Sequence, residues 1–99
     1  MKIEKELAGS VMTMSITGRL DTVTAPELDT ELRTSLSGVT ELVFDFSALD
    51  YISSAGLRVV LNAQKMMSRQ GTFIVRHVNA DVMDVFEMTG FSEMLTIEN

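Results

Sequence analysis

The stretch Asp50-Tyr51-Ile52-Ser53-Ser54-Ala55-Gly56-Leu57 follows the apolar run Leu42–Phe46 and opens a long segment with helical periodicity. It therefore places two hydroxyl groups where a strand gives way to a helix. The first N–H groups of any helix have no partner within the helix, and they carry the positive end of its dipole. A serine at this point either caps the helix or holds a phosphate. One motif thus admits a structural and a regulatory interpretation.

Upstream of this motif, the sequence shows the two-residue period of half-buried strands. From Met12 to Thr17 apolar residues alternate with hydroxyl residues, and Ile3 and Leu7 lie on one side of an earlier polar segment. Ala8-Gly9-Ser10 supplies a turn between the two segments. We expect an antiparallel hairpin at or near the edge of a sheet.

A first helix is expected directly after this hairpin. Thr24 and Glu27 have the spacing of a capping box, and Pro26 lies in the first turn. Apolar residues at helical spacing then continue to Ser37, and Gly38 stands where a C-cap glycine would. The expected helix runs from about Thr24 to Ser37.

The second half of the chain alternates between apolar runs and amphipathic helical patterns. A second helix opens at the serine motif and ends at Arg69-Gln70-Gly71, and a third begins at Asn79 and ends at Gly90. Three short strands are expected, at residues 42–46, 73–75 and 95–97. This order predicts an α/β fold in one domain, residues 1–99, with a mixed, mostly parallel sheet and helices mainly on one face.

Composition excludes several classes of function. Fourteen Asp and Glu residues outnumber eight Lys and Arg residues, which gives a net charge of −6 and disfavours nucleic acid as a direct partner. There is no cysteine and one histidine, so we expect no metal site. No apolar run is long enough for a membrane span, and the acidic start does not resemble a signal peptide, so a cytoplasmic protein is expected.

Known catalytic motifs are also missing from the sequence. It contains no Gly-x-Ser-x-Gly elbow, no Walker loop and no Gly-x-Gly-x-x-Gly. We therefore expect neither an enzyme nor a bound cofactor.

Four short motifs, taken in order, resemble the STAS domain family. They are Thr17-Gly18-Arg19-Leu20-Asp21, Asp45-Phe46-Ser47, the serine motif at Asp50–Leu57, and Met88-Thr89-Gly90-Phe91. The resemblance covers nearly the whole chain and is greatest to the bacterial anti-sigma factor antagonists. It implies a STAS-like fold with an N-terminal antiparallel hairpin.

The resemblance also implies a phosphorylation site. Carried over by position, the phosphorylated serine is Ser54, and Ser53 takes the place of an aspartate that is usual in the family, so Ser53 is the alternative acceptor. Asp21 is implied to lie near this serine. Gly56 has no Cβ, which would let another chain approach the first helical turn closely. The expected docking face comprises Asp21, Thr22, Thr24, Ser53, Ser54, Ala55, Gly56 and Arg58.

The implied function is that of a switched binding module. The unphosphorylated form would bind an anti-sigma factor serine kinase and so release a sigma factor for transcription. The kinase would use ATP to phosphorylate this chain, and a serine phosphatase would restore it. A phosphate beside Asp21 and Asp50 would then repel the partner. The alternative is a structural STAS subunit of a transport or stress-signalling assembly, in which Ser54 only caps a helix.

Overall fold

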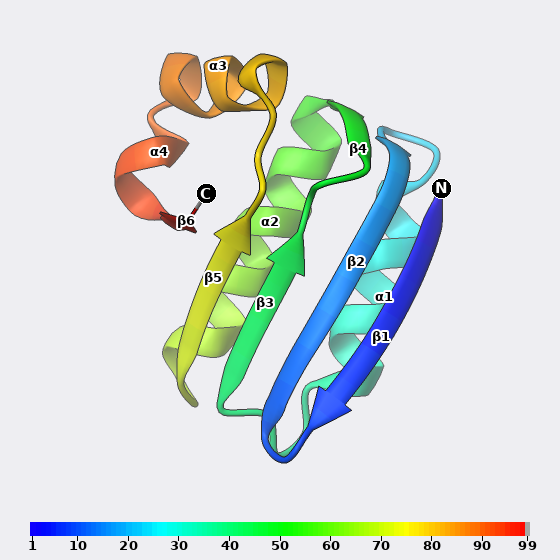
Figure 1. Cartoon of the computed structure of the whole chain (residues 1–99), viewed down its shortest axis with the longest axis vertical. Coiled ribbons are helices and arrows are strands. Elements are labelled where there is room, and N and C mark those ends of the chain that lie inside the picture. The colour runs from blue at the N-terminus through cyan, green and yellow to red at the C-terminus, as the bar shows by residue number, and fades with distance from the viewer. Residues whose placement is uncertain (99) are drawn as a thin grey trace.

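A mixed β-sheet with two long helices packed on one face forms the body of this computed structural model, which describes residues 1–98 (Figure 1). The elements along the chain are β1 (Lys2–Ala8), β2 (Val11–Leu20), α1 (Ala25–Ser35), β3 (Glu41–Asp45), β4 (Leu49–Ile52), α2 (Ser54–Ser68), β5 (Thr72–Arg76), α3 (Ala80–Thr89), α4 (Phe91–Met94) and β6 (Thr96–Glu98). The sheet order is β1-β2-β3-β5-β6, and β4 pairs with β2 alone.

The N-terminal hairpin is antiparallel and forms one edge of the sheet, as predicted. Ile3 is opposite Ile16, and Leu7 is opposite Met12. Gly9 lies in the turn with a φ of 63°, in the left-handed region that favours glycine. Every other strand pair in the described chain is parallel. The predicted mixed, mostly parallel sheet is confirmed.

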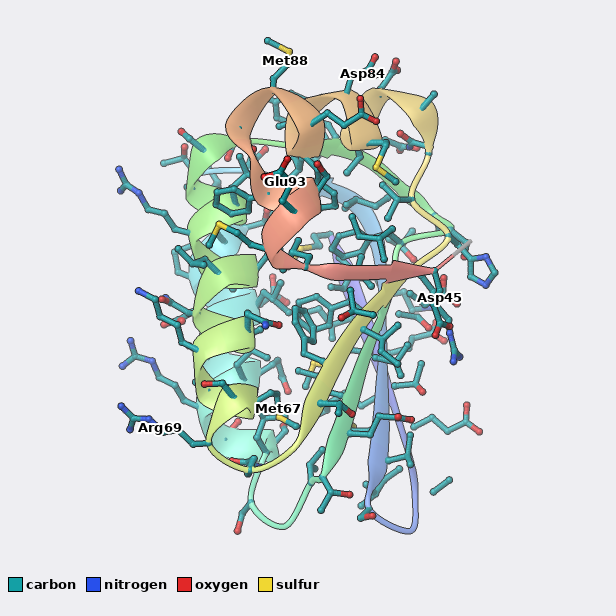
Figure 2. All side chains as sticks on the ribbon, turned by 90° about the vertical axis from the view of Figure 1, so that its left-hand side faces the viewer. Asp45, Met67, Arg69, Asp84, Met88 and Glu93 are labelled. Atoms are coloured by element: carbon teal, nitrogen blue, oxygen red, sulfur yellow. The ribbon has the colours of Figure 1, made fainter. Side chains whose placement is uncertain are left out.

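The core lies between the sheet and the two long helices. Side chains on that face of the central strands, such as Met14, Phe44 and Val75, are fully buried. Figure 2 shows α1 and α2 on one side of the sheet, with Met67 pointing between α2 and the strands, and Asp45 pointing away on the other side. The helices α3 and α4 lie beyond the ends of β3 and β5 (Figure 1). Phe86 of α3 belongs to the buried core.

The strand β4 was not predicted from the sequence, and it determines where the serine motif lies. The first half of β2 pairs with β3, whereas its last residues, Gly18 to Leu20, pair with β4. The register shifts between Gly18 and Arg19, and Gly18 has a φ of 96°. Only the two ends of β4, Leu49 and Ile52, are buried. So short a segment carries neither an alternating nor a continuous apolar pattern.

The helices differ from expectation in the bounds of the first one and in the presence of an additional short one. The first helix runs from Ala25 to Ser35, shorter at both ends than predicted. Gly90 ends α3 in the left-handed conformation, as predicted, but a further single-turn helix, α4, follows it. Within residues 1–98, no helix has both the length and the apolar composition needed to cross a bilayer.

Candidate functional site

The pairing of β2 with β4 brings the two halves of the predicted site together. Leu20 is in register with Ile52, and the backbone N–H of Ser53 donates to the carbonyl of Leu20 at 2.9 Å. The segment Asp21–Thr24 and the first turn of α2 therefore leave the sheet from adjacent positions. Both lie at the end of the sheet where β2 and β4 finish (Figure 1).

The two serines of the motif have different roles. Ser53 is extended, half-buried and outside the helix, and its Oγ accepts a hydrogen bond from the N–H of Gly56 at 3.3 Å. This is the geometry of an N-cap. Ser54 is the first residue of α2, is exposed, and its hydroxyl has no hydrogen-bond partner among residues 1–98. The interpretation of Ser54 as the cap is wrong, because Ser53 fills that role.

Gly56 does not contribute an exposed docking position. It is buried, and a Cβ built on it would lie 2.8 Å from Cγ of Leu20 and 2.9 Å from Cγ1 of Ile52. Contacts that short are not tolerated between carbon atoms. The expectation that Gly56 allows another chain to approach is therefore wrong. Instead, the missing Cβ allows the start of α2 to pack closely on β2 and β4.

Asp21 starts the turn that leads into α1. Its Oδ1 accepts hydrogen bonds from the N–H groups of Val23 at 3.0 Å and Thr24 at 3.1 Å, and its carbonyl accepts from the N–H of Ala25 at 2.8 Å. The hydrogen bond from the Thr24 backbone is the largest cause that holds the pKa of Asp21 below its usual value, and the Arg19 guanidinium contributes in the same direction. Asp21 is thus ionised and held in place at neutral pH.

The predicted capping box at Thr24 is absent. The Thr24 hydroxyl donates to the carbonyl of Arg19 at 2.8 Å and accepts from the N–H of Asp21 at 2.9 Å, and it makes no capping bond to α1. The N–H of Glu27 instead donates to the carbonyl of Thr24 at 3.0 Å. The Asp21 carboxylate binds the N–H groups of Val23 and Thr24, which precede α1, so α1 has no side-chain cap.

Two exposed apolar side chains flank this site, and sequence reasoning missed both. Val23 is 85% exposed within the Asp21–Thr24 turn, and Tyr51 is 41% exposed on β4. The Arg19 guanidinium lies 4.2 Å from the centre of the Tyr51 ring, a cation–π distance. The sequence carried one usable signal for Val23, because it is an isolated apolar residue between two hydroxyl residues just before the predicted first helix.

A shallow groove joins the turn to α2. Thr22, Pro26, Ala55 and Arg58 are among the residues that line it, and its volume is about 290 Å³. Three predicted docking residues thus share one surface that spans both segments. Among residues 1–98, no group of three acidic or histidine side chains converges in a way that could hold a metal ion.

Comparison with known proteins agrees with this architecture. The model of the STAS domain matches residues 2–99. This chain belongs to the STAS domain family. A Bordetella bronchiseptica protein named as an anti-sigma factor antagonist, BtrV, is 33% identical to this STAS domain over 101 residues, which cover 100% of this chain and 87% of that protein.

Solved structures show the same fold. An anti-sigma factor antagonist from Mycobacterium paratuberculosis is similar to the STAS domain with a TM-score of 0.89 and 22% identity, over 98% of this chain and 84% of that one. The Bacillus cell fate determinant SpoIIAA, in its phosphorylated form, is similar with a TM-score of 0.77 and 18% identity, over 99% of this chain and 92% of that one. The predicted membership of the anti-sigma factor antagonist family is confirmed.

Within the STAS domain, the predicted site residues divide into two groups. Those with an exposed or partly exposed surface are Asp21, Thr22, Thr24, Ser53, Ser54, Ala55 and Arg58. Gly56 alone is buried. Ser54 and Asp21 each follow a residue of one backbone hydrogen bond, from the N–H of Ser53 to the carbonyl of Leu20, so their segments leave the sheet from adjacent positions.

Proposed function

We propose that this STAS domain is a phosphorylation-switched binding module that acts in the cytoplasm. In its unphosphorylated form it binds an anti-sigma factor serine kinase, and this binding releases a sigma factor for transcription. The kinase uses ATP to phosphorylate Ser54, and a serine phosphatase removes the phosphate. The domain is a substrate and a ligand in this cycle, and it performs no catalysis itself. The relative named as an anti-sigma factor antagonist supports this assignment.

The observation that carries the proposal is the division of roles between the two serines. Because Ser53 caps α2, the Ser54 hydroxyl is not needed for the fold. A phosphate at Ser54 would stand at the positive end of the helix dipole, where an anion is favourable by about 0.3–1 kcal/mol. Modification can therefore change the surface while the fold is kept.

The negative charge of the surrounding surface supports the proposal that phosphorylation weakens partner binding. A phosphate adds about −1.5 to −2 charges at neutral pH. Asp21 is already ionised next to this helix turn, and Asp50 is exposed on β4. A partner surface that fits the neutral Ser54 hydroxyl would then meet a concentrated negative charge. Phosphorylation is thus expected to weaken binding by repulsion.

The decisive experiment incubates the purified domain with its partner kinase and ATP, followed by phosphopeptide mapping. Phosphate at Ser54 is expected in the wild type, and none in Ser54→Ala. Modification of Ser53 alone would show that the acceptor is the capping serine. If the domain neither binds nor is modified by any anti-sigma factor kinase, the structural STAS subunit is the better interpretation.

A further inference from the structure

The distribution of charge over the surface is strongly uneven. The helix α2 contains Arg58 and Lys65, is followed directly by its C-cap residue Arg69, and has no Asp or Glu. In the rest of the chain, five Lys and Arg residues stand against fourteen Asp and Glu residues. A basic helix on so acidic a chain concentrates the positive potential in one place.

Within residues 1–98, the cations of α2 and its C-cap are also the Lys and Arg side chains that form no ion pair. The ion pairs within residues 1–98 are Lys2–Glu4, Lys5–Glu31, Arg19–Asp21, Arg33–Asp29 and Arg76–Glu98. Arg58, Lys65 and Arg69 form no ion pair in that part of the chain, and all three are exposed. Separations of seven and four residues place them on one side of the helix. We call these three residues the basic stripe.

The basic stripe borders a groove between α1 and α2. Lys65 and Arg69 line its larger part, of about 420 Å³, and Arg58 lines the adjoining shallow part. Both parts are also lined by Asp29 and Asn62. Asp29 is the one carboxylate among these lining residues, and Arg33 neutralises it at 2.9 Å. Figure 2 shows Arg69 on the outer side of α2, away from the sheet.

We propose that this groove binds an acidic segment of a partner protein. The distance along α2 from Arg58 to Arg69 is about 16 Å, which matches three turns of an acidic helix. The groove supplies apolar contact through Met66, Val59 and Ala55 as well as charge. Nucleic acids and anionic membranes are larger polyanions, and the acidic remainder of the chain would repel them.

The groove begins where the phosphorylation site lies. Arg58 follows Ser54 by four residues, so the two side chains are neighbours on the helix surface. An anion at position 54 would pair with Arg58 and remove one cation from the basic stripe. A negative charge at position 54 is therefore expected to lower the affinity of the groove for an acidic segment. The groove and its other cations are present whether or not Ser54 is phosphorylated.

The test uses the intact isotope-labelled domain and a synthetic helical peptide of about 12 residues rich in glutamate. Amide chemical shifts are followed during titration at low ionic strength. Saturable shifts are expected at Asn62, Lys65 and Arg69, and Lys65→Glu is expected to weaken binding about fivefold or more. Lys2→Glu, with the same change of net charge on β1, is the matched control and is expected to weaken binding less than about twofold.

Three results would overturn the proposal. The first is the absence of saturable shifts at millimolar peptide, and the second is equal weakening by Lys65→Glu and Lys2→Glu. The third is tighter binding of a DNA duplex or of phosphatidylserine vesicles to the same residues, which would assign the groove to another class of partner. No kinase or ATP is present in this experiment, so its result is independent of whether Ser54 is phosphorylated.

Discussion

Gly56 packs so closely on Leu20 that a Cβ on Gly56 would lie 2.8 Å from both Cγ and the carbonyl oxygen of Leu20. That same carbonyl accepts the hydrogen bond from Ser53. Leu20 is therefore the contact point for two features. The start of α2 packs closely on it, and its carbonyl aligns the serine motif with the Asp21 turn. A side chain at position 56 would force the two segments apart.

Gly56→Ala is consequently expected to destabilise the domain. Overpacking costs about 1–3 kcal/mol, and the better helix propensity of alanine returns up to about 1 kcal/mol. One of the nearest atoms is the backbone oxygen of Leu20, which cannot rotate away, so the cost lies in the upper part of this range and urea unfolding should show a net loss of about 1–2 kcal/mol. Asn62→Ala, an exposed change on the same helix, is the control and should be neutral or slightly stabilising. Wild-type stability of Gly56→Ala would mean that α2 can move away from β2 at little cost.

Ser53→Ala and Ser54→Ala should separate the capping role from the signalling role. Loss of the Ser53 cap is expected to cost about 1 kcal/mol of unfolding free energy, whereas the exposed Ser54→Ala change should stay within about 0.5 kcal/mol. Phosphate transfer should show the reverse order, with incorporation retained in Ser53→Ala and lost in Ser54→Ala. Equal stability of the two variants would contradict the assignment of Ser53 as the cap.

Most of this architecture could be predicted because it depends on local patterns. The hairpin carries an alternating pattern, the central strand a continuous apolar run, and the helix starts at Ser53 and Asn79 capping residues, and each of these signals acts within a few residues. Strand β4 and the burial of Gly56 could not be predicted in this way. Both result from the pairing of β4 with the end of β2, about 30 residues away in sequence, and glycine has the same local signature whether exposed or buried.

Asp21 should give the domain a specific dependence on acid. Its pKa is lower in the folded state than the usual 3.8, so its contribution to stability is complete above that value. The contribution is lost as the pH falls through the lower folded value, because the protonated carboxyl accepts the Val23 and Thr24 N–H groups less well. Melting temperatures measured from about pH 5 to about pH 3 should therefore fall more steeply for the wild type than for Asp21→Asn. Asparagine keeps the acceptor oxygen without titrating, and identical slopes would refute this role.

Ser54→Asp should mimic the effect of phosphorylation on the partner and on the fold. A negative charge in the first turn of α2 is expected to raise the unfolding free energy by about 0.3–1 kcal/mol through the helix dipole. The same charge should weaken binding to the kinase, as measured by calorimetry. Ser54→Asn has nearly the same shape without the charge and should bind more tightly than Ser54→Asp. If both variants bind equally, size and not charge controls the interaction.

Val23 should be a main apolar contact for the kinase. Its side chain is 85% exposed, so the free domain gains little stability from it, while the Asp21 hydrogen bonds fix the turn that presents it. Burying a valine in an interface is worth about 1.5–3 kcal/mol, and Val23→Ala removes part of that area. We expect the dissociation constant to rise about 5- to 30-fold with no change in melting temperature. Leu7→Ala is the control, because Leu7 is 60% exposed on β1 next to the hairpin turn, at the other end of β2. Equal affinities of Val23→Ala and the wild type would place the kinase on another face of the domain.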